Sequence, residues 1–333
     1  MEPKRISLAL LPTPLSCLER TSKLWGVDVW IKRDDLTGAV ETGNKIRKLE
    51  FVMAEALEQG ADMVITCGGE QSNHCRATAA VARKLGLDVV LMLRRTGEGP
   101  TGNWLLDMIL GAEFVWVTPE EYKQRDEFMA QLAEEYRKRG RKPYIIPEGA
   151  SNPLGAMGYF HAAHEVYAQF KAENFYPDFI VIGSGSGGTY AGLWTGFKNV
   201  GFDVKIVGIS AGPDTKELKE HINDVALGIK SKYFPELELN AEEILLFDDY
   251  WQPGYGVITF EHVRFICDFA AREGIILDST YTSKAFMAAE DLIKKGFIPK
   301  GSRVLLWHTG GVFGLFSKGQ LFREHYFSGE RTK

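Results

Sequence analysis

Three short stretches of the chain carry side chains that could take part in chemistry. ETGNKIRKLEF (41–51) places three cations directly after a Gly-Asn pair. GSGSGGTYAG (183–192) is rich in glycine, and CGGEQSNHCRA (67–77) contains a Ser-Asn pair. A lysine amine can attack a carbonyl, a glycine-rich loop can bind an anion, and hydroxyl and amide groups can orient a substrate. We therefore ask whether the fold brings these groups together.

The first stretch predicts a helix in which one lysine differs from its neighbours. The apolar positions that follow at helical spacing are Ile46, Leu49, Met53, Ala56 and Leu57, so a helix is expected to start near Asn44. At about 100° per residue, Lys45 lies roughly 60° from the centre of this apolar stripe, and Arg47 and Lys48 lie more than about 100° away. We expect Lys45 to lean toward the interior and the other two cations to face water or anions.

This position could make Lys45 a nucleophile. Burial and neighbouring cations lower the pKa of a lysine, so that its neutral amine becomes accessible. The alternative is a lysine that extends along the helix surface with its amine in water. The helical spacing alone leaves both interpretations open.

The glycine-rich stretch 183–192 follows an apolar strand and opens a helix, which is typical of phosphate binding. The glycines also match GxGxxG, so a dinucleotide site and an NAD-type oxidoreductase are alternatives. A dinucleotide fold would need an acidic residue at the end of the next strand. That strand ends at Ser210, and Asp203 lies at its beginning. The pattern therefore favours a single phosphate group over a dinucleotide.

The Ser72-Asn73 pair also follows a predicted strand and starts a helix. Serine and asparagine often cap helices, and the same position presents free backbone N–H groups. The pair is therefore either an ordinary N-cap or a binding site for a carboxylate or oxyanion.

The elements that must position these groups alternate between strand and helix. Strands are expected at 61–68, 87–93, 113–117, 142–149, within 178–188, at 204–212 and at 303–311, and helices at 71–86, near 103–111 and over 119–139. Nearly continuous apolar strands in this order predict α/β units with parallel sheets covered on both faces. Two such series imply two units with a cleft between them, and 146–158 is the expected crossover. The stretch 213–250 is charged and irregular, and we assign no chemistry to it.

Composition excludes several classes of protein. The chain has 333 residues, of which 45% are hydrophobic, and a formal net charge of −5, so a nucleic-acid partner is not expected. No apolar run is long enough to span a membrane, and no leader with a cleavage site is visible, which favours the cytoplasm. The four cysteines form no CxxC, and His161 and His164 have no companion ligand. Neither a disulfide framework nor a metal site is expected.

The combination of groups favours pyridoxal 5′-phosphate (PLP) as the cofactor. Lys45 would hold the PLP aldehyde as a Schiff base, the glycine loop would hold the phosphate, and the Ser-Asn pair would orient the ring and substrate.

Motifs over most of the chain then extend this interpretation. They are IKRDDLTG (31–38), GNKIRKLEF (43–51), QSNH (71–74), GSGSGGTYAGL (183–193), PGYG (253–256), ILDSTYTSKAF (276–286) and HTGGVFG (308–314). In this order they resemble the 1-aminocyclopropane-1-carboxylate (ACC) deaminase/D-cysteine desulfhydrase family. The resemblance implies PLP fold type II, which is tryptophan synthase β-like, with two three-layer α/β domains and mainly parallel sheets. It further implies a large PLP-binding domain of residues 1–47 plus 158–333, a small domain of 48–157, and a homodimer.

The resemblance assigns roles residue by residue. The catalytic residues are Lys45, Ser72 and Tyr281; the cofactor-binding residues are Lys45, Asn73, Ser186, Gly187, Gly188, Thr189 and Thr282; the substrate-binding residues are Ser72, Asn73, His74, Tyr255, Tyr281 and Thr309. The sequence departs from the family pattern in two places. Thr42 stands where a glycine is usual before Gly43, and Ser279-Thr280 replaces Pro-Val before Tyr281.

Two threonines bear on the choice of reaction. In the deaminase members that this chain resembles, the residue after the tyrosine is a glutamate that faces the pyridine nitrogen of PLP. This chain has Thr282 at that position. A carboxylate favours a protonated ring, which supports cyclopropane opening, while a hydroxyl cannot compensate a full positive charge. A weaker electron sink still allows a good leaving group to depart from Cβ. Thr309 likewise replaces the leucine of the deaminase pattern.

The expected activity is therefore β-elimination from a small amino-acid substrate, with D-cysteine converted to pyruvate, hydrogen sulfide and ammonia. ACC deamination and an L-cysteate or D-serine lyase remain alternatives, as does a PLP carrier without catalysis. Lys45 would accept the Cα proton, Ser72 would bind the carboxylate, and Tyr281 would assist proton transfer at the leaving group.

Overall fold

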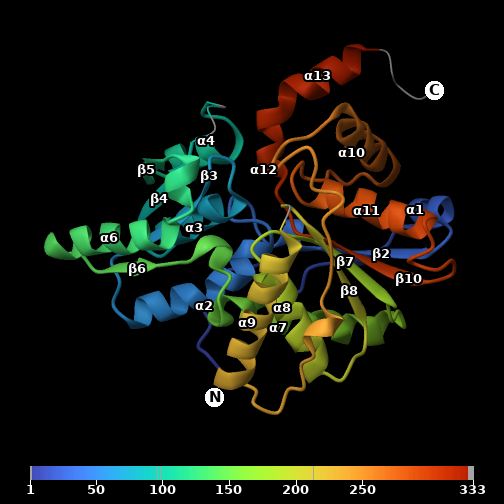
Figure 1. The fold of residues 1–333 in the computed structure, drawn as a ribbon, viewed down its shortest axis with the longest axis horizontal. Helices are drawn as coiled ribbons and strands as arrows, with labels where there is room; N and C mark the ends of the chain where they lie inside the picture. Colours follow the sequence, from blue (N-terminus) through green and yellow to red (C-terminus); the bar gives the residue numbers. More distant parts are fainter. Residues whose placement is uncertain (1, 96, 98, 213, 329–333) are drawn as a thin grey trace.

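The structure is a computed structural model that describes residues 2–95, 97, 99–212 and 214–328. Figure 1 shows two α/β units, one around each of two sheets. The strands are β1 (Leu15–Cys17), β2 (Asp28–Arg33), β3 (Met63–Gly69), β4 (Asp88–Arg94), β5 (Glu113–Val117), β6 (Pro143–Ile145), β7 (Phe179–Ser184), β8 (Lys205–Ser210), β9 (Leu245–Phe247) and β10 (Arg303–His308). The predicted α/β class with parallel sheets is confirmed.

The larger sheet has the order β1-β2-β10-β7-β8-β9, and the smaller has the order β5-β4-β3-β6. All neighbouring pairs are parallel except β1 and β2. Continuous burial along β3 and β7 agrees with sheets that are covered on both faces.

Helices cover these sheets. The longer ones are α1 (Glu19–Trp25), α2 (Asn44–Glu58), α3 (Asn73–Lys84), α4 (Gly102–Ile109), α6 (Arg125–Lys138), α7 (Pro153–Glu173), α8 (Gly188–Asn199), α9 (Thr215–Lys232), α10 (Phe260–Glu273), α11 (Thr282–Lys294) and α13 (Gly319–Phe327). Two short helices, α5 (Pro119–Tyr122) and α12 (Val312–Leu315), and four 3₁₀ turns, Asp34–Leu36, Glu148–Ala150, Ala241–Glu243 and Phe316–Lys318, complete the described elements.

Two helical expectations were wrong. The pattern over 119–139 is not one helix, because the chain turns between α5 and α6. The stretch 213–250 is not irregular throughout, because α9 occupies 18 of its residues. The buried side chains of α9 recur at helical spacing, namely Leu218, Ile222, Val225, Ala226 and Ile229. The sequence contains this helical spacing, but the charged residues between these positions made it less apparent.

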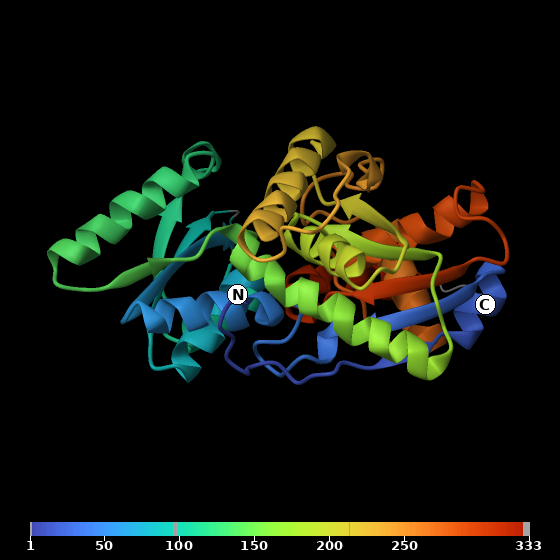
Figure 2. The same ribbon diagram turned by 90° about the horizontal axis from the view of Figure 1, so that it is seen from below.

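Three glycines let helices approach closely at the centre of the molecule, where Figure 2 shows the long helix α7. A Cβ at Gly158 of α7 would lie 2.2 Å from the backbone oxygen of Arg47 in α2. A Cβ at Gly192 or Gly196 of α8 would lie 2.3 or 2.5 Å from backbone oxygens of α7. These contacts exclude larger residues and fix α2, with its lysines, against α7, and α7 against α8.

A shared hydrophobic core joins the two units. One cluster of buried residues includes Leu49 of α2, Val64 of β3 and Ile180 of β7. The expected domain boundaries, 47/48 and 157/158, fall inside α2 and α7, and that division stays a prediction. In the described part of the chain, no helix has the length and apolar character needed to cross a membrane.

Candidate active site

A cavity of about 450 Å³ lies between the two sheets, next to the carboxyl ends of β3, β4, β7 and β8. The crevice beyond the carboxyl ends of parallel strands is where open α/β sheets bind ligands, and the volume suits a small ligand. The predicted residues that line it are Lys45, Ser72, Asn73, His74, Ser186, Gly187, Thr189, Tyr255, Tyr281 and Thr309. Gly188 and Thr282 do not line it, although each is buried and adjoins a lining residue in the sequence.

The turn before Lys45 depends on one glycine. Gly43 has φ 108°, and a Cβ there would lie 3.0 Å from the Thr309 backbone oxygen. Thr42 has no positive φ, its hydroxyl donates to the Asp35 carbonyl at 2.5 Å, and its own carbonyl accepts from Arg76. The threonine therefore fits where the family usually has glycine, and α2 starts in the expected place.

Lys45 is partly exposed, and its exposed part faces the cavity. Burial lowers the pKa of its amine to about 8, although the nearby Glu148 carboxylate acts in the opposite direction. A substantial fraction of the amine is therefore neutral near pH 7 to 8 and able to attack a carbonyl. The helical spacing in the sequence had predicted that Lys45 leans toward the interior.

The expectation that Arg47 and Lys48 face water was wrong, because both are fully buried. Lys48 Nζ donates to the Gly149 carbonyl at 3.2 Å and to Ser151 Oγ at 3.0 Å. Burial, and then the charge of Lys45, lower the pKa of Lys48 well below its ordinary value. The other half of the expectation, an anion partner, holds for Arg47, which pairs with two carboxylates, whereas Lys48 pairs with none among the described residues.

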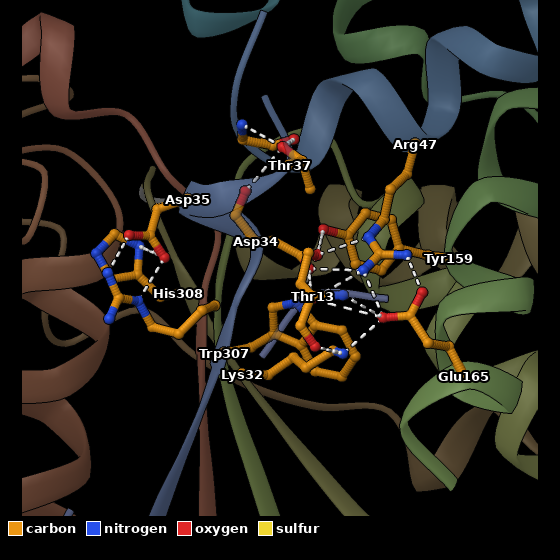
Figure 3. A network of polar contacts seen from close by, with 12 residues as sticks. Thr13, Lys32, Asp34, Asp35, Thr37, Arg47, Tyr159, Glu165, Trp307 and His308 are labelled. Atoms are coloured by element: carbon orange, nitrogen blue, oxygen red, sulfur yellow. Dashed lines mark hydrogen bonds and ion pairs between the residues drawn. The ribbon is translucent and has the colours of Figure 1, made fainter. Parts of the chain in front are cut away.

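Figure 3 shows why Arg47 is buried. Its guanidinium donates to Asp34 Oδ1 at 2.8 Å and to Glu165 Oε2 at 2.9 Å, two carboxylates from different elements. Tyr159 and Trp307 also donate to Asp34 Oδ2, at 2.5 and 2.8 Å. The arginine therefore ties α2 to α7 and to the larger sheet instead of contacting ligand.

The glycine loop ends in the start of α8, as predicted. Gly187 has φ 77° and precedes Gly188, so the first backbone N–H groups of α8 point out of the helix end. Ser186 Oγ lies 2.7 Å from Ser151 Oγ, and Asn44 donates from Nδ2 to Thr189 Oγ1 at 3.0 Å. These hydroxyls and N–H groups, with Lys48 Nζ beside Gly188, are groups that could hold a phosphate.

Sequence reasoning missed the residues that support this cradle. A Cβ at Gly187 would lie 2.9 Å from Ile222 of α9, and His221 Nε2 contacts the Ser151 carbonyl at 3.1 Å. A Cβ at Gly149 would lie 2.2 Å from Ser186 Oγ and 3.1 Å from Lys45 Nζ. Gly149 and Ser151 belong to the predicted crossover 146–158. In the sequence, only the glycines of this crossover indicated that other groups would pack closely against its backbone.

Ser72 is both an N-cap and a cavity residue. Its Oγ accepts from the Cys75 N–H at 3.2 Å, which leaves the hydroxyl proton available to a ligand. Asn73 Oδ1 accepts from Asn103 at 2.9 Å, so its Nδ2 is the group that can face the cavity. The two interpretations of this pair, cap and oxyanion site, are therefore compatible.

His74 lies behind this pair and is buried. Its Nε2 lies 2.8 Å from Thr66 Oγ1, whereas no described residue bonds its Nδ1. Burial, followed by the charges of Lys45 and Lys48, lowers the pKa of His74 well below its usual value. The imidazole is therefore neutral over the ordinary pH range.

Two tyrosines meet on the other side of the cavity. The hydroxyls of Tyr255 and Tyr281 lie 2.6 Å apart. Burial, and then the neighbouring Tyr255, raise the pKa of Tyr281 well above its ordinary value, so this phenol stays protonated. Lys284 holds the loop that carries Tyr255, because its Nζ donates to the carbonyls of Trp251 and Gly254 at 2.7 and 2.9 Å.

Asp278 fixes Tyr281 and Thr282 from below. Its carboxylate accepts from the backbone N–H groups of Thr280, Tyr281 and Thr282, and from the Thr282 hydroxyl at 2.7 Å. This network holds Tyr281 although Ser-Thr replaces the usual Pro-Val. Thr282 is fully buried, and Thr309 faces the cavity.

A family model described as "Pyridoxal-phosphate dependent enzyme" matches residues 6–310. A Thermotoga maritima protein, provisionally named an ACC deaminase, is 45% identical over 95% of this chain and 99% of its own length. A D-cysteine desulfhydrase of Salmonella choleraesuis is 38% identical over 94% of this chain and 95% of its own. A crystal structure of an ACC deaminase homologue superposes with a TM-score of 0.90, at 39% identity, covering 97% and 96% of the two chains.

The chain belongs to the PLP-dependent enzymes. Within them, it is a member of the ACC deaminase/D-cysteine desulfhydrase family, as the motifs predicted. The predicted fold type and cofactor are confirmed as well, and the oxidoreductase alternative was wrong.

The residues of the cavity fit PLP. Lys45 would hold the aldehyde, and Asn73 would meet the ring from the end of α3. Lys48, Ser186 and the start of α8 would hold the phosphate, since they offer an amine, a hydroxyl and the N–H groups of a helix start close to one another. A side chain at Gly149 would collide with Ser186 Oγ and crowd Lys45 Nζ, so the glycine lets these two groups keep their places.

Proposed function

We propose that the enzyme removes a β-substituent from a small amino acid, with D-cysteine as its substrate and pyruvate, hydrogen sulfide and ammonia as products. PLP-dependent elimination or deamination is the activity that the names of the relatives support. The choice of D-cysteine is our proposal, and the observation that carries it is the uncharged, buried Thr282 beside Tyr281.

PLP, when bound, supplies an electron sink for the charge that develops at Cα of the substrate. Lys45 supports two steps in this proposal. Its amine holds the cofactor aldehyde before substrate binds, and once displaced it accepts the Cα proton. A pKa of about 8 suits both tasks, because the free amine is neutral often enough to act and basic enough to take the proton.

Ser72 and the start of α3 bind the substrate carboxylate in this proposal. The Ser72 hydroxyl keeps its proton for donation, and the free N–H groups of a helix start attract negative charge. This binding orients Cα toward Lys45.

Tyr281 serves the leaving group. Its raised pKa keeps the phenol protonated, so it can donate a proton to sulfur as the Cβ–S bond breaks. Tyr255, at 2.6 Å, orients that hydroxyl and offers a path by which the proton is replaced.

Thr282 and Thr309 distinguish this site from one built for cyclopropane opening. The Thr282 hydroxyl is engaged with Asp278 and adds no charge at the ring position. Without a carboxylate in direct contact, the ring is a weaker electron sink, which suffices for hydrosulfide but not for a carbon leaving group. Thr309 adds a second polar group to the cavity wall.

The proposal is tested by pyruvate release from D- and L-cysteine, L-cysteate, D-serine, β-chloroalanine and ACC. We expect D-cysteine to give the highest kcat/KM. Lys45→Ala should abolish turnover and the absorbance of covalently held PLP, while Arg95→Ala, at an exposed position, serves as control.

The other outcomes each favour a different assignment. ACC as the best substrate would overturn the argument from Thr282 and Thr309. Bound PLP without pyruvate from any of these amino acids would instead favour a cofactor carrier. Full activity of Lys45→Ala would exclude the mechanism itself.

A further inference from the structure

Arg94 has no part in the mechanism above, although it lines the same cavity. It is the last residue of β4 and pairs in register with Gly69 at the end of β3. A Cβ at Gly69 would lie 3.9 Å from Arg94 Nη2, and the Gly69 carbonyl accepts from the Ser72 N–H at 2.9 Å. The guanidinium therefore lies beside the turn that presents Ser72.

Aromatic rings from both units hold this guanidinium in place. Arg94 Cζ lies 5.3 Å from the centre of the Tyr122 ring, in the smaller unit. It lies 5.7 Å from the centre of the Tyr255 ring, which belongs to the loop after β9. Stacking on ring faces fixes the plane of an arginine but leaves its N–H groups free to donate at the edges.

A neighbouring arginine provides a contrast. Arg125 also lines the cavity, but Glu148 neutralises it at 3.1 Å, and Tyr122 donates to the same carboxylate at 2.8 Å. Among the residues that the structure describes, no carboxylate pairs with Arg94. A cation that is fixed by rings and faces a cavity is suited to an anionic ligand.

The position of Arg94 indicates which part of a substrate it meets. In the proposed function, on which this inference rests, the carboxylate occupies Ser72 and the leaving group lies at Tyr281. Arg94 lies beside the Ser72 turn on one side and the ring of Tyr255, the partner of Tyr281, on the other. A group on the β-carbon of the substrate would lie in the space between these two.

We propose that Arg94 binds negative charge on the β-substituent, so that the site prefers amino acids with an acidic β-group to neutral ones of the same shape. The same interaction serves cysteine. As the Cβ–S bond breaks, both electrons stay on sulfur, and Arg94 stabilises the negative charge that develops there while Tyr281 supplies the proton that completes hydrogen sulfide.

A matched pair of unreactive ligands tests this directly. Aspartate and asparagine have the same shape, but only aspartate has a charged β-group. Both enantiomers of each ligand are titrated calorimetrically into the PLP-loaded enzyme. For the enantiomer that binds more tightly, aspartate should bind about tenfold more tightly than asparagine. Arg94→Gln should reduce this preference to less than about twofold, while Arg94→Lys should keep part of it.

Arg95 is the control for charge and location. It is the next residue, is exposed, and stacks on Trp116 away from the cavity. Arg95→Gln removes the same charge and should leave the aspartate preference intact.

Three results would overturn the proposal. One is a wild-type enzyme that does not prefer aspartate or that binds neither ligand. Another is an Arg94→Gln enzyme whose affinities for aspartate and asparagine fall by the same factor, which would assign Arg94 to the α-carboxylate. The third is loss of the preference in Arg95→Gln. Pyruvate release, measured separately, distinguishes failure of the proposed function, since the binding preference does not depend on turnover.

Discussion

At the scale of single residues, the environment of Lys45 decides its chemistry. Burial lowers the pKa of its amine to about 8, so the reactive neutral form is reached about two and a half pH units earlier than in a free lysine. In the apoprotein, covalent attachment of PLP should therefore accelerate about tenfold per pH unit below pH 8 and level off above it.

Stopped-flow absorbance of apoprotein mixed with PLP measures this rate. Nα-acetyl-lysine, whose amine has an ordinary pKa, is the control and should keep accelerating to about pH 10. An enzyme profile that follows acetyl-lysine would show that burial does not act on Lys45 as described.

Asp34 presents a buried carboxylate whose charge the fold requires. Burial alone would raise its pKa, but Arg47, Lys32 and the Tyr159 hydroxyl lower it to about 2. Asp34→Asn leaves Arg47 without one of its two carboxylates, and should reduce the free energy of unfolding by about 3–5 kcal/mol. Urea unfolding at pH 7 measures this, with Asp35→Asn, at a partly exposed position, expected to cost less than about 1 kcal/mol.

The pH dependence follows from the same carboxylate. Since its folded pKa is depressed, its stabilising contribution is fully present above the unfolded value of about 3.9 and is lost as pH falls toward 2. The difference in stability between wild type and Asp34→Asn should therefore shrink between about pH 4 and pH 2. A difference that stays constant down to pH 2 would contradict the assignment.

At the scale of elements, α2 explains what sequence reasoning could and could not predict. Its start, its apolar face and the direction of Lys45 followed from helical spacing. The burial of Arg47 and Lys48 did not, because spacing identifies one apolar face and assumes that the opposite face meets water. Here α2 packs against α7 and the crossover 146–158 as well, so its polar face is also enclosed.

Three buried strands were predicted closely, whereas β6 ends four residues before its expected end. The β5 bounds agreed with expectation, and β3 and β4 differed by a residue or two, since buried parallel strands have continuous apolar runs. The charged surface of α9 concealed its apolar face. Motifs located most cavity residues, but Arg94 belongs to none of them, because its place in the cavity depends on contacts with distant segments.

The loop before Tyr255 should depend on Lys284 of α11. This lysine is buried, and its ammonium donates hydrogen bonds to two carbonyls of the loop, those of Trp251 and Gly254. Lys284→Ala should lower kcat about tenfold while PLP content stays unchanged, because Tyr255 no longer meets Tyr281 in a fixed geometry.

Added ammonium ions should restore part of the activity, since they can bind the same carbonyls. Steady-state kinetics with and without ammonium chloride checks this, with Lys294→Ala at an exposed position of the same helix as control. Equal loss of activity in both variants, or no effect of ammonium, would argue against a positioning role.

At the scale of the whole molecule, the cavity draws on both units. Asn73 and Ser72 come from the smaller sheet's helix, and Ser186 and Thr189 come from the larger one. PLP at 100 times its Kd should therefore add about 2.7 kcal/mol to the free energy of unfolding, and its removal should destabilise both units together.

Thermal unfolding of the apo and PLP-loaded forms measures this effect. Fluorescence and circular dichroism should shift to the same extent on removal of PLP. A shift in only one of these signals would show that the units unfold independently. The homodimer and the expected domain boundaries remain predictions.

The contrast between Thr42 and Gly43 bears on how distant relatives are recognised. Gly43 needs a backbone angle and a close approach that only glycine tolerates, whereas Thr42 has neither constraint and uses its side chain to bond Asp35. A search pattern that demands two glycines before Asn-Lys would reject this chain for a residue that the turn does not require. A signature defined by dihedral angles, with one free position before Gly-Asn-Lys, would retain it.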